Sequence, residues 1–230
     1  MSTIYLSGTP AIVVSVKKSA RAKRLSLRVS SLDGRVTLTA PNRISSRKIE
    51  NFVYEKEAWL RHNVSQVPDQ IRVKIGIELP ILGASVRIDH TAKNQIYQHE
   101  GQLFVPTHKS NPAARVLGYL KTLARENITQ SSDFYAAKIG QNYTKLSLRD
   151  TRSRWGSCSQ DRALMFSWRL IMAPREILDY VAAHEVAHLQ HMDHSERFWD
   201  EVEQLYGDYR PARLWLREKG TELHRYRFVD

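Results

Sequence analysis

The sequence contains almost no cysteine, since Cys158 is the only one among 230 residues. A single cysteine cannot close an intramolecular disulfide and cannot build a multi-cysteine zinc finger. Any metal site must therefore be made of histidine and carboxylate side chains, and a reducing cytosol suits the chain.

Long apolar runs are also missing. No stretch reaches the roughly 18 apolar residues of a membrane span, and the first residues do not join a basic segment to an apolar run as secretory signals do. Hydrophobic residues make up 42% and charged residues 26% of the chain, as in ordinary globular proteins. We therefore expect a soluble, cytoplasmic protein that folds around one large or two small cores.

Acidic residues are scarce relative to basic ones: 24 Asp and Glu against 35 Lys and Arg give a net charge of +11. Most of the excess lies in residues 1–110, which hold 17 basic and 8 acidic residues. Six basic residues follow one another there with no acid between them: Lys17, Lys18, Arg21, Lys23, Arg24 and Arg28. Such a run could contact phosphates of a nucleic acid, or it could keep a strand edge from aggregating.

Residues 1–110 predict a small, mostly β module. Leu25, Leu27 and Val29 alternate with polar residues, and Asp33-Gly34 is typical of a hairpin turn. A helix is expected after Ser45-Ser46, ending before Pro68 and burying the stripe Ile49, Phe52, Val53, Trp59 and Leu60. Further short strands are expected around 71–77, 86–89 and 103–105.

Residues 111–230 predict a second domain, in which a helix that carries the candidate site packs on a small sheet. A helix should run from Asn111-Pro112 to about Ile139. Two strands, 145–150 and 163–170, are separated by the loop RSRWGSCSQDR. Three more helices are expected at about 174–190, 195–206 and 211–219. The chain as a whole is thus expected to be α+β.

The helix expected at about 174–190 carries the sequence His184-Glu185-Val186-Ala187-His188. Residues four apart lie on one helical face, so both imidazoles can bind one ion. Glu185 is turned about 100° from His184, which suits a general base that contacts water activated by the metal. A pair of hydrogen-bonded core histidines is the alternative, but burying two imidazoles beside a glutamate is costly without a purpose.

A catalytic zinc usually has three protein ligands and a water, so a third ligand is needed. His191 lies on the same helical face but about 10 Å along the axis from His184. If the chain turns at Met192-Asp193, His194 can return to the ion. We favour His194 as the third ligand and His191 as the alternative, with Asp193 or Glu196 as possible hydrogen-bond partners of a ligand imidazole.

Longer runs around this motif resemble the YgjP-like metallopeptidase family, also described as predicted metal-dependent hydrolases. They are Arg154-Trp155-Gly156-Ser157-Cys158, Trp168-Arg169-Leu170-Ile171, Asp179-Tyr180-Val181, His184-Glu185-Val186-Ala187-His188-Leu189, His194-Ser195 and Phe198-Trp199. The resemblance extends over most of the chain. It implies a zincin-type catalytic domain with His184, His188 and His194 as zinc ligands and Glu185 as the catalytic carboxylate.

The Arg-Trp-Gly-Ser-Cys segment has no role that the resemblance transfers. Arg154 could hold an anionic group of a substrate or form a structural ion pair, and Gly156 would permit a close backbone approach. Cys158 is not expected to act as a nucleophile, because a zinc site already supplies one. Trp155, Trp168 and Trp199 are expected to pack in the core.

Three functions are compatible with these residues. The first is a zinc metallopeptidase acting on peptides. The second is a nucleotide pyrophosphatase that uses the same centre, since some members of the family are described as releasing pyrophosphate from UTP. The third is a nucleic-acid-associated protein whose basic N-terminal module, residues 1–110, binds DNA or RNA. The resemblance favours the metallopeptidase.

Overall fold

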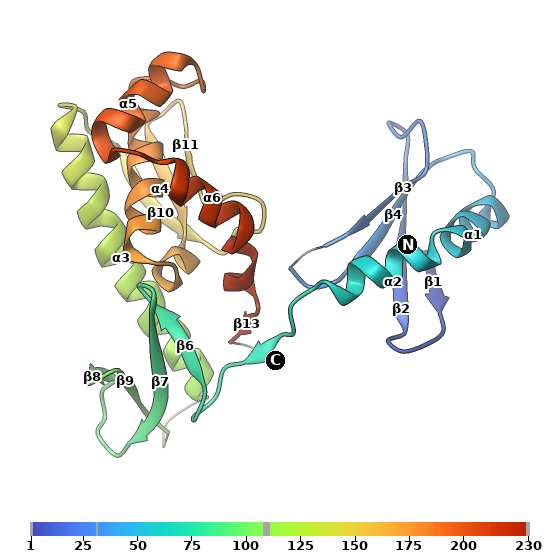
Figure 1. Cartoon of the computed structure of the whole chain (residues 1–230), viewed down its shortest axis with the longest axis horizontal. Helices are drawn as coiled ribbons and strands as arrows, with labels where there is room; N and C mark the ends of the chain where they lie inside the picture. The colour runs from blue at the N-terminus through green and yellow to red at the C-terminus, as the bar shows by residue number, and fades with distance from the viewer. Residues whose placement is uncertain (1, 31, 108–110, 229–230) are drawn as a thin grey trace. The chain divides into compact units, whose positions relative to one another are not determined.

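The computed structural model describes residues 2–30, 32–107 and 111–228. The chain forms two compact units, an N-terminal unit of residues 1–70 and a C-terminal unit of residues 71–230 (Figure 1). The sequence had suggested a boundary at 110/111 instead. The difference arises because the strands after residue 71 bury Leu79, Ile88 and Leu103 in the same core as the helices that follow. The strands between residues 71 and 106 therefore belong to the C-terminal unit, although the sequence groups them with the β-rich N-terminal residues.

The N-terminal unit is a four-stranded sheet with two helices on one face. Its strands are β1 (Ser2–Leu6), β2 (Ile12–Ser19), β3 (Ser26–Val29) and β4 (Val36–Pro41), in the order β1-β2-β4-β3. β2 and β4 are parallel, whereas β1 pairs with β2 and β3 pairs with β4 in antiparallel fashion. The hairpin predicted at Asp33-Gly34 joins β3 to β4, and Gly34 takes the positive φ of 66° that such turns require.

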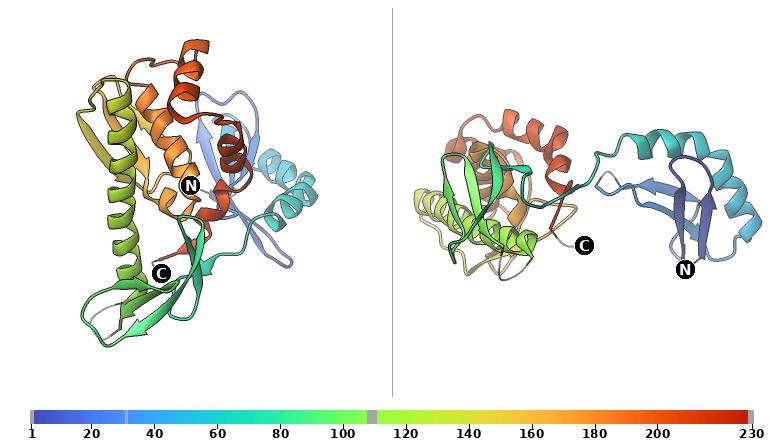
Figure 2. Two further views of the ribbon diagram at one scale, coloured as in Figure 1. Left: turned by 60° about the vertical axis from the view of Figure 1, so that its left-hand side comes forward. Right: turned by 90° about the horizontal axis from the view of Figure 1, so that it is seen from below.

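The helices of this unit are α1 (Ser46–Glu55) and α2 (Glu57–Ser65). The serine predicted to begin the helix does so, since the Ser45 hydroxyl accepts a hydrogen bond from the Lys48 amide. The single predicted helix is interrupted at Lys56, so Trp59 leaves the buried stripe and is 45% exposed. Ile49, Val53 and Leu60 belong to one buried cluster with the sheet residues Val14 and Leu38. Figure 2 shows the ribbon of this unit from two further sides.

The C-terminal unit begins with two small sheets. β5 (Ile71–Arg72) pairs in parallel with β13 (Tyr226–Arg227), close to the far end of the described chain. β6 (Glu78–Ile81), β7 (Ala84–Thr91), β8 (Tyr97–His99) and β9 (Gln102–Pro106) form a sheet in the order β6-β7-β9-β8. The next element is the long helix α3 (Pro112–Lys138), which the side chain of Asn111 caps by accepting from the Ala113 amide.

A three-stranded sheet and five further helical elements complete the described part of this unit. Its strands are β10 (Lys145–Arg149), β11 (Gly156–Cys158) and β12 (Ala163–Ser167), in the order β10-β12-β11. A 3-10 helix, η1 (Trp168–Met172), follows β12 directly. The remaining helices are α4 (Arg175–Ala187), α5 (Glu196–Tyr206), α6 (Arg210–Glu218) and the 3-10 helix η2 (Gly220–His224).

These elements confirm the α+β prediction: a mostly β N-terminal region comes first in the sequence, and the helix that carries the His-Glu-x-x-His motif packs on a small sheet. Three local predictions were wrong. The segment predicted as a loop contains β11, the strand predicted to reach residue 170 ends at Ser167, and the motif helix ends at Ala187 rather than near Gln190. Within the described residues, no helix is long and apolar enough to cross a membrane.

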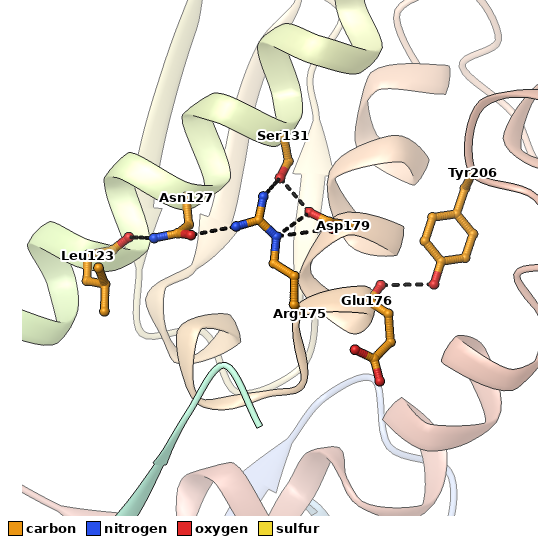
Figure 3. A network of polar contacts seen from close by, with 7 residues as sticks. All are labelled: Leu123, Asn127, Ser131, Arg175, Glu176, Asp179 and Tyr206. Carbon is orange, nitrogen blue, oxygen red and sulfur yellow. Dashed lines mark hydrogen bonds and ion pairs between the residues drawn. The ribbon is translucent and has the colours of Figure 1, made fainter. Parts of the chain in front are cut away.

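Helix α4 is attached to α3 by a polar network around Arg175 (Figure 3). The Arg175 guanidinium donates to both carboxylate oxygens of Asp179, at 3.0 and 3.1 Å, and to Asn127 Oδ1 at 2.6 Å. The Ser131 hydroxyl donates to Asp179 at 2.6 Å, and the Tyr206 hydroxyl donates to the Glu176 carbonyl. This network holds the first turn of α4, which no side chain caps.

Replacing Arg175 by Met should lower the free energy of unfolding by about 1–2 kcal/mol, because Asp179 and Asn127 lose a charged donor while they remain partly buried. Denaturant unfolding followed by circular dichroism measures this change. Arg197→Met, an exposed arginine in the first turn of α5, is the matched control and should change stability by less than about 0.5 kcal/mol. Equal effects of the two variants would show that the network contributes nothing.

Candidate metal centre and cavity

The structure brings His184, His188 and His194 together. One ring nitrogen of each lies within 4.8 Å of the others, and Nε2 of His184 is 3.4 Å from Nε2 of His194. His184 lies in α4, His188 caps its C-terminus, and His194 lies just before α5. After α4 the backbone hydrogen bonds span three residues instead of four: the Leu189 amide donates to the Val186 carbonyl, and the Gln190 amide donates to the Ala187 carbonyl. The chain turns there, between His188 and His194.

The spacing of His184 and His194 fits two ligands of one zinc ion. In a tetrahedral site with Zn–N bonds of about 2.0–2.1 Å, two ligand nitrogens are about 3.4 Å apart, which matches the 3.4 Å between His184 and His194. Nδ1 of His188 lies 2.8 Å from the His191 carbonyl. A carbonyl can only accept, so this nitrogen carries the proton and Nε2 keeps a free lone pair for a metal.

The other candidates near the motif have different roles. The side chain of His191 is not in the cluster, and only its carbonyl contributes, by fixing His188. Asp193 accepts from the Ser195 amide at 3.2 Å, and among the described residues neither Asp193 nor Glu196 has a hydrogen bond to the imidazole of His184, His188 or His194. The suggestion that Asp193 or Glu196 orients a histidine is therefore not supported.

An aromatic side chain that sequence reasoning left unassigned contacts all three imidazoles. Phe198, fully buried in α5, stacks on His188 with ring centroids 4.4 Å apart, and its centroid is 4.9 Å from those of His184 and His194. Trp199 flanks His184 and His194 at 5.6 and 5.8 Å. The sequence signal that could have identified Phe198 is its position four residues after His194. At the beginning of a helix, this spacing places two side chains on the same side.

Glu185 lies beside the histidines and is 5% exposed. Burial raises its pKa to about 8, and the positive charge of Arg154 opposes that rise. Burial also lowers the pKa of His184 to about 3, with the charges of His188 and His194 acting in the same direction. The pKa of His188 is lowered by burial as well. Oε2 of Glu185 and Nδ1 of His184 have no hydrogen-bond partner among the described residues.

The cluster opens into a cavity of about 620 Å³. Glu185 and the three histidines form one side, and residues 153–158, including all of β11, form another. The rest of the lining is mostly apolar, from Tyr180, Val181, Met192 and Leu216. The Arg-Trp-Gly-Ser-Cys segment is thus a wall of the site rather than a remote loop.

Contacts from the end of the unit support this wall. Trp155 packs against η2, where its ring lies 5.5 Å from that of His224 and close to Gly220. The buried guanidinium of Arg169 binds both carboxylate oxygens of Asp150, the residue after β10, and donates to the Leu223 carbonyl. Trp168 is fully buried as expected, and Trp155 and Trp199 are partly buried against the same core. In addition, Trp155 lines the cavity and Trp199 flanks two of the histidines.

Gly156 is required by space rather than by its backbone angles. A Cβ at this position would lie 2.5 Å from Cγ and Oε1 of Glu185. Cys158, two residues along β11, is half-buried, and burial together with the charge of Glu185 raises its pKa to about 11. Its thiol is protonated at neutral pH, in agreement with the expectation that it is not a nucleophile.

Replacing Gly156 by Ala should reduce any hydrolytic activity at this site by at least about tenfold, because the new methyl group displaces the Glu185 carboxylate. Steady-state kinetics and bound metal should be measured together. Gly118→Ala, in α3, is the control: its Cβ meets nothing within 4 Å, and it should leave activity unchanged. Full activity of Gly156→Ala would mean that Glu185 tolerates displacement.

Comparisons with known proteins place these residues in a family. A family model described as YgjP-like, metallopeptidase domain, matches residues 23–219, more than four-fifths of the chain. None of the curated proteins matches the sequence. Among solved structures, the crystal structure of the metallopeptidase zymogen of Pyrococcus abyssi abylysin is similar at 21% identity, with a TM-score of 0.35, over 45% of this chain and 97% of that one. The family match shows that the chain belongs to the YgjP-like metallopeptidase family and is a metal-dependent hydrolase.

Proposed function

We propose that this chain is a zinc-dependent peptidase in which His184, His188 and His194 hold the metal and Glu185 is the general base. The observation that carries the proposal is the convergence of three imidazole nitrogens beside a buried carboxylate on one side of a cavity. A bound zinc ion supplies Lewis acidity toward the scissile carbonyl and the attacking water.

The protein's own groups account for the proton movements. Burial raises the pKa of Glu185 to about 8, and the side chain would ionise at neutral pH once the neighbouring imidazoles hold a cation. The Glu185 carboxylate, which borders the cavity, would then take a proton from the attacking water as the water oxygen bonds to the carbonyl carbon. When the C–N bond breaks, the protonated Glu185 returns this proton to the leaving amine nitrogen. Gly156 leaves the space in which the carboxylate sits, and Phe198 holds the histidine rings in orientation.

The open edge of β11 favours a peptide as the substrate. β11 is an edge strand, since β12 is its only sheet neighbour among the residues that the structure describes. On either side of β11, the Trp155 carbonyl accepts from the Ser167 amide at 2.8 Å and the Ser159 amide donates to the Ala163 carbonyl at 3.0 Å. Both groups therefore point toward β12. Hydrogen bonds alternate along an antiparallel strand, so the N–H and C=O groups of Gly156 and Cys158 point to the open edge. An extended peptide can pair with these groups and place a peptide bond over Glu185.

A nucleoside triphosphate fits the cavity less well. Apart from the histidines, Arg154 is the only cationic residue of its lining. A triphosphate carries several negative charges and is usually bound by clustered cations and by backbone amides at a helix N-terminus. This site offers neither in its described lining, so the nucleotide alternative receives no specific support.

We further propose that Arg154 binds an anionic group of the peptide. Its side chain borders the cavity, is exposed, and forms no salt bridge with another described residue. Arg154→Gln should lower kcat/KM at least about tenfold for peptides with a carboxylate near the cleaved bond, because a charge-assisted hydrogen bond contributes about 1.5–3 kcal/mol. For matched neutral peptides assayed in parallel, Arg154→Gln should lower kcat/KM by less than about threefold. Equal losses for both would contradict this role.

Peptide cleavage and pyrophosphate release should be tested on the same zinc-loaded preparation. A casein digest analysed by mass spectrometry reports cleavage, and a UTP assay reports pyrophosphate. We expect peptide cleavage that a chelator stops and added zinc restores. Pyrophosphate release without peptide cleavage would replace this proposal by the nucleotide one, and inactivity of the zinc-loaded protein toward peptides would refute it.

A further inference from the structure

The sheet of the N-terminal unit has two unlike faces. One is buried under α1 and α2 (Figure 1). Residues opposite one another in the register share a face, so Ser15, Thr37 and Arg28 form one row of the other face, and Lys17, Thr39 and Ser26 form the next. This open face therefore presents hydroxyl groups and cations. Lys17, Ser26 and Arg28 are exposed, and the others are partly exposed.

The acidic residues of this unit are all elsewhere. Residues 1–70 hold 12 Lys and Arg against 5 Asp and Glu, a net charge of +7. None of the five acids lies in a strand: they are in the β3–β4 turn, in the two helices and after α2, at Asp33, Glu50, Glu55, Glu57 and Asp69. Glu55 and Glu57 pair with helix cations, Lys56 and Arg61. The open face is thus positively charged, and none of the strands that form it carries an acidic residue.

Further cations collect at one end of this sheet. β2 and β4 are parallel and end together, with Ser19 opposite Pro41, and β3 begins at the same end. The connection from β2 to β3 adds Arg21, Lys23 and Arg24, all exposed. Protection of a strand edge does not explain Lys17 and Lys18, because β2 lies inside the sheet, between β1 and β4.

The open face also carries an exposed aromatic ring. Tyr5 of β1 is 71% exposed and lies opposite Val13 of β2, which is 49% exposed. An aromatic ring standing on a flat sheet is a platform on which a nucleic-acid base can stack, and neighbouring cations and hydroxyls can then contact the phosphates.

We propose that the open face of residues 1–70 binds single-stranded nucleic acid, with Lys17 and Arg28 contacting phosphates and Tyr5 stacking on a base. This interaction is separate from the proposed peptidase site, because all of its residues belong to the N-terminal unit. Single-stranded RNA and DNA share the required phosphates and unstacked bases, and the two are compared in the test.

The test is fluorescence anisotropy of the full chain with labelled 20-nucleotide RNA and DNA strands across a series of salt concentrations. Lys17→Glu with Arg28→Glu should weaken binding at least about tenfold at 100 mM salt and reduce the salt slope by about 1.4, since each phosphate contact contributes about 0.7 on single strands. Lys74→Glu with Arg87→Glu is the matched control: it changes the net charge equally at exposed sites of the C-terminal unit and should weaken binding less than about threefold.

A second variant separates base stacking from general attraction to polyanions. Tyr5→Ser should weaken oligonucleotide binding at least about fivefold, because stacking on an aromatic ring contributes about 1–3 kcal/mol per base, and it should leave heparin binding unchanged. Circular dichroism verifies that each variant is folded. The proposal is overturned if the unaltered chain does not bind at 100 μM, if both charge-reversed pairs weaken binding equally, or if anionic lipid vesicles bind and oligonucleotides do not.

Discussion

Replacement of Glu185 by Gln is expected to reduce peptide cleavage by about 10²–10⁴-fold while zinc remains bound. The amide has nearly the shape of the carboxylate, so it fits the space beside Gly156, but it cannot accept the proton of the attacking water. Because Glu185 does not belong to the histidine cluster, its replacement leaves the proposed ligands intact. Initial rates on a fluorogenic peptide, together with metal analysis of the same sample, measure both effects.

Glu176→Gln provides the matched control for this experiment. Glu176 lies in the first turn of the same helix, and its side chain is exposed. Its replacement should change the rate less than about twofold. If Glu185→Gln keeps more than a tenth of the rate, the general-base assignment is wrong. If it loses its zinc, the carboxylate supports the metal rather than the proton transfer.

The second large effect is expected at His194. His194→Ala should raise the dissociation constant for zinc by more than about 100-fold, since even the loss of a residue that only orients a ligand costs about 10–100-fold. His184 and His188 would remain as two ligands on one helix, an incomplete set for a catalytic zinc site. Competition with a chromogenic chelator measures the constant.

His191→Ala distinguishes the two candidates that the sequence left open. Only the carbonyl of His191 contacts the cluster, through Nδ1 of His188, and alanine retains that carbonyl. Zinc affinity should therefore change less than about threefold. A large loss in His191→Ala with none in His194→Ala would reverse the assignment of the third ligand.

The histidine cluster could be predicted from the sequence because its geometry is local. His184 and His188 are on one face of a helix whose existence the apolar pattern indicated independently, and His194 is close along the chain. The wall formed by residues 153–158 could not be predicted. Gly156-Ser157-Cys158 has no alternating pattern, and it is a strand only because it pairs with β12, the segment that follows it after a short turn.

The domain boundary escaped prediction for a related reason. A change from strands to helices at residue 111 is visible in the sequence, whereas the burial of Leu79 and Leu103 in one cluster with residues of α3 depends on contacts between distant segments. The basic run shows the same limit. Its charges were evident, but only the strand order shows that Lys17 lies on an interior strand, and only the register shows which side chains share its face.

The pairing of β5 with β13 has a consequence for the order in which the chain folds during synthesis. Ile71, at the start of the C-terminal unit, lies opposite Tyr226 in the register, and its amide donates to the Arg225 carbonyl. Arg169 donates to the carbonyls of Leu223 and Tyr226. On the ribosome, residues 1–70 can complete their own core early, because it uses none of the later segments. The unit with the histidine cluster can pair β5 with β13 only after residues 226–227 have emerged, so it completes its fold later than the N-terminal unit.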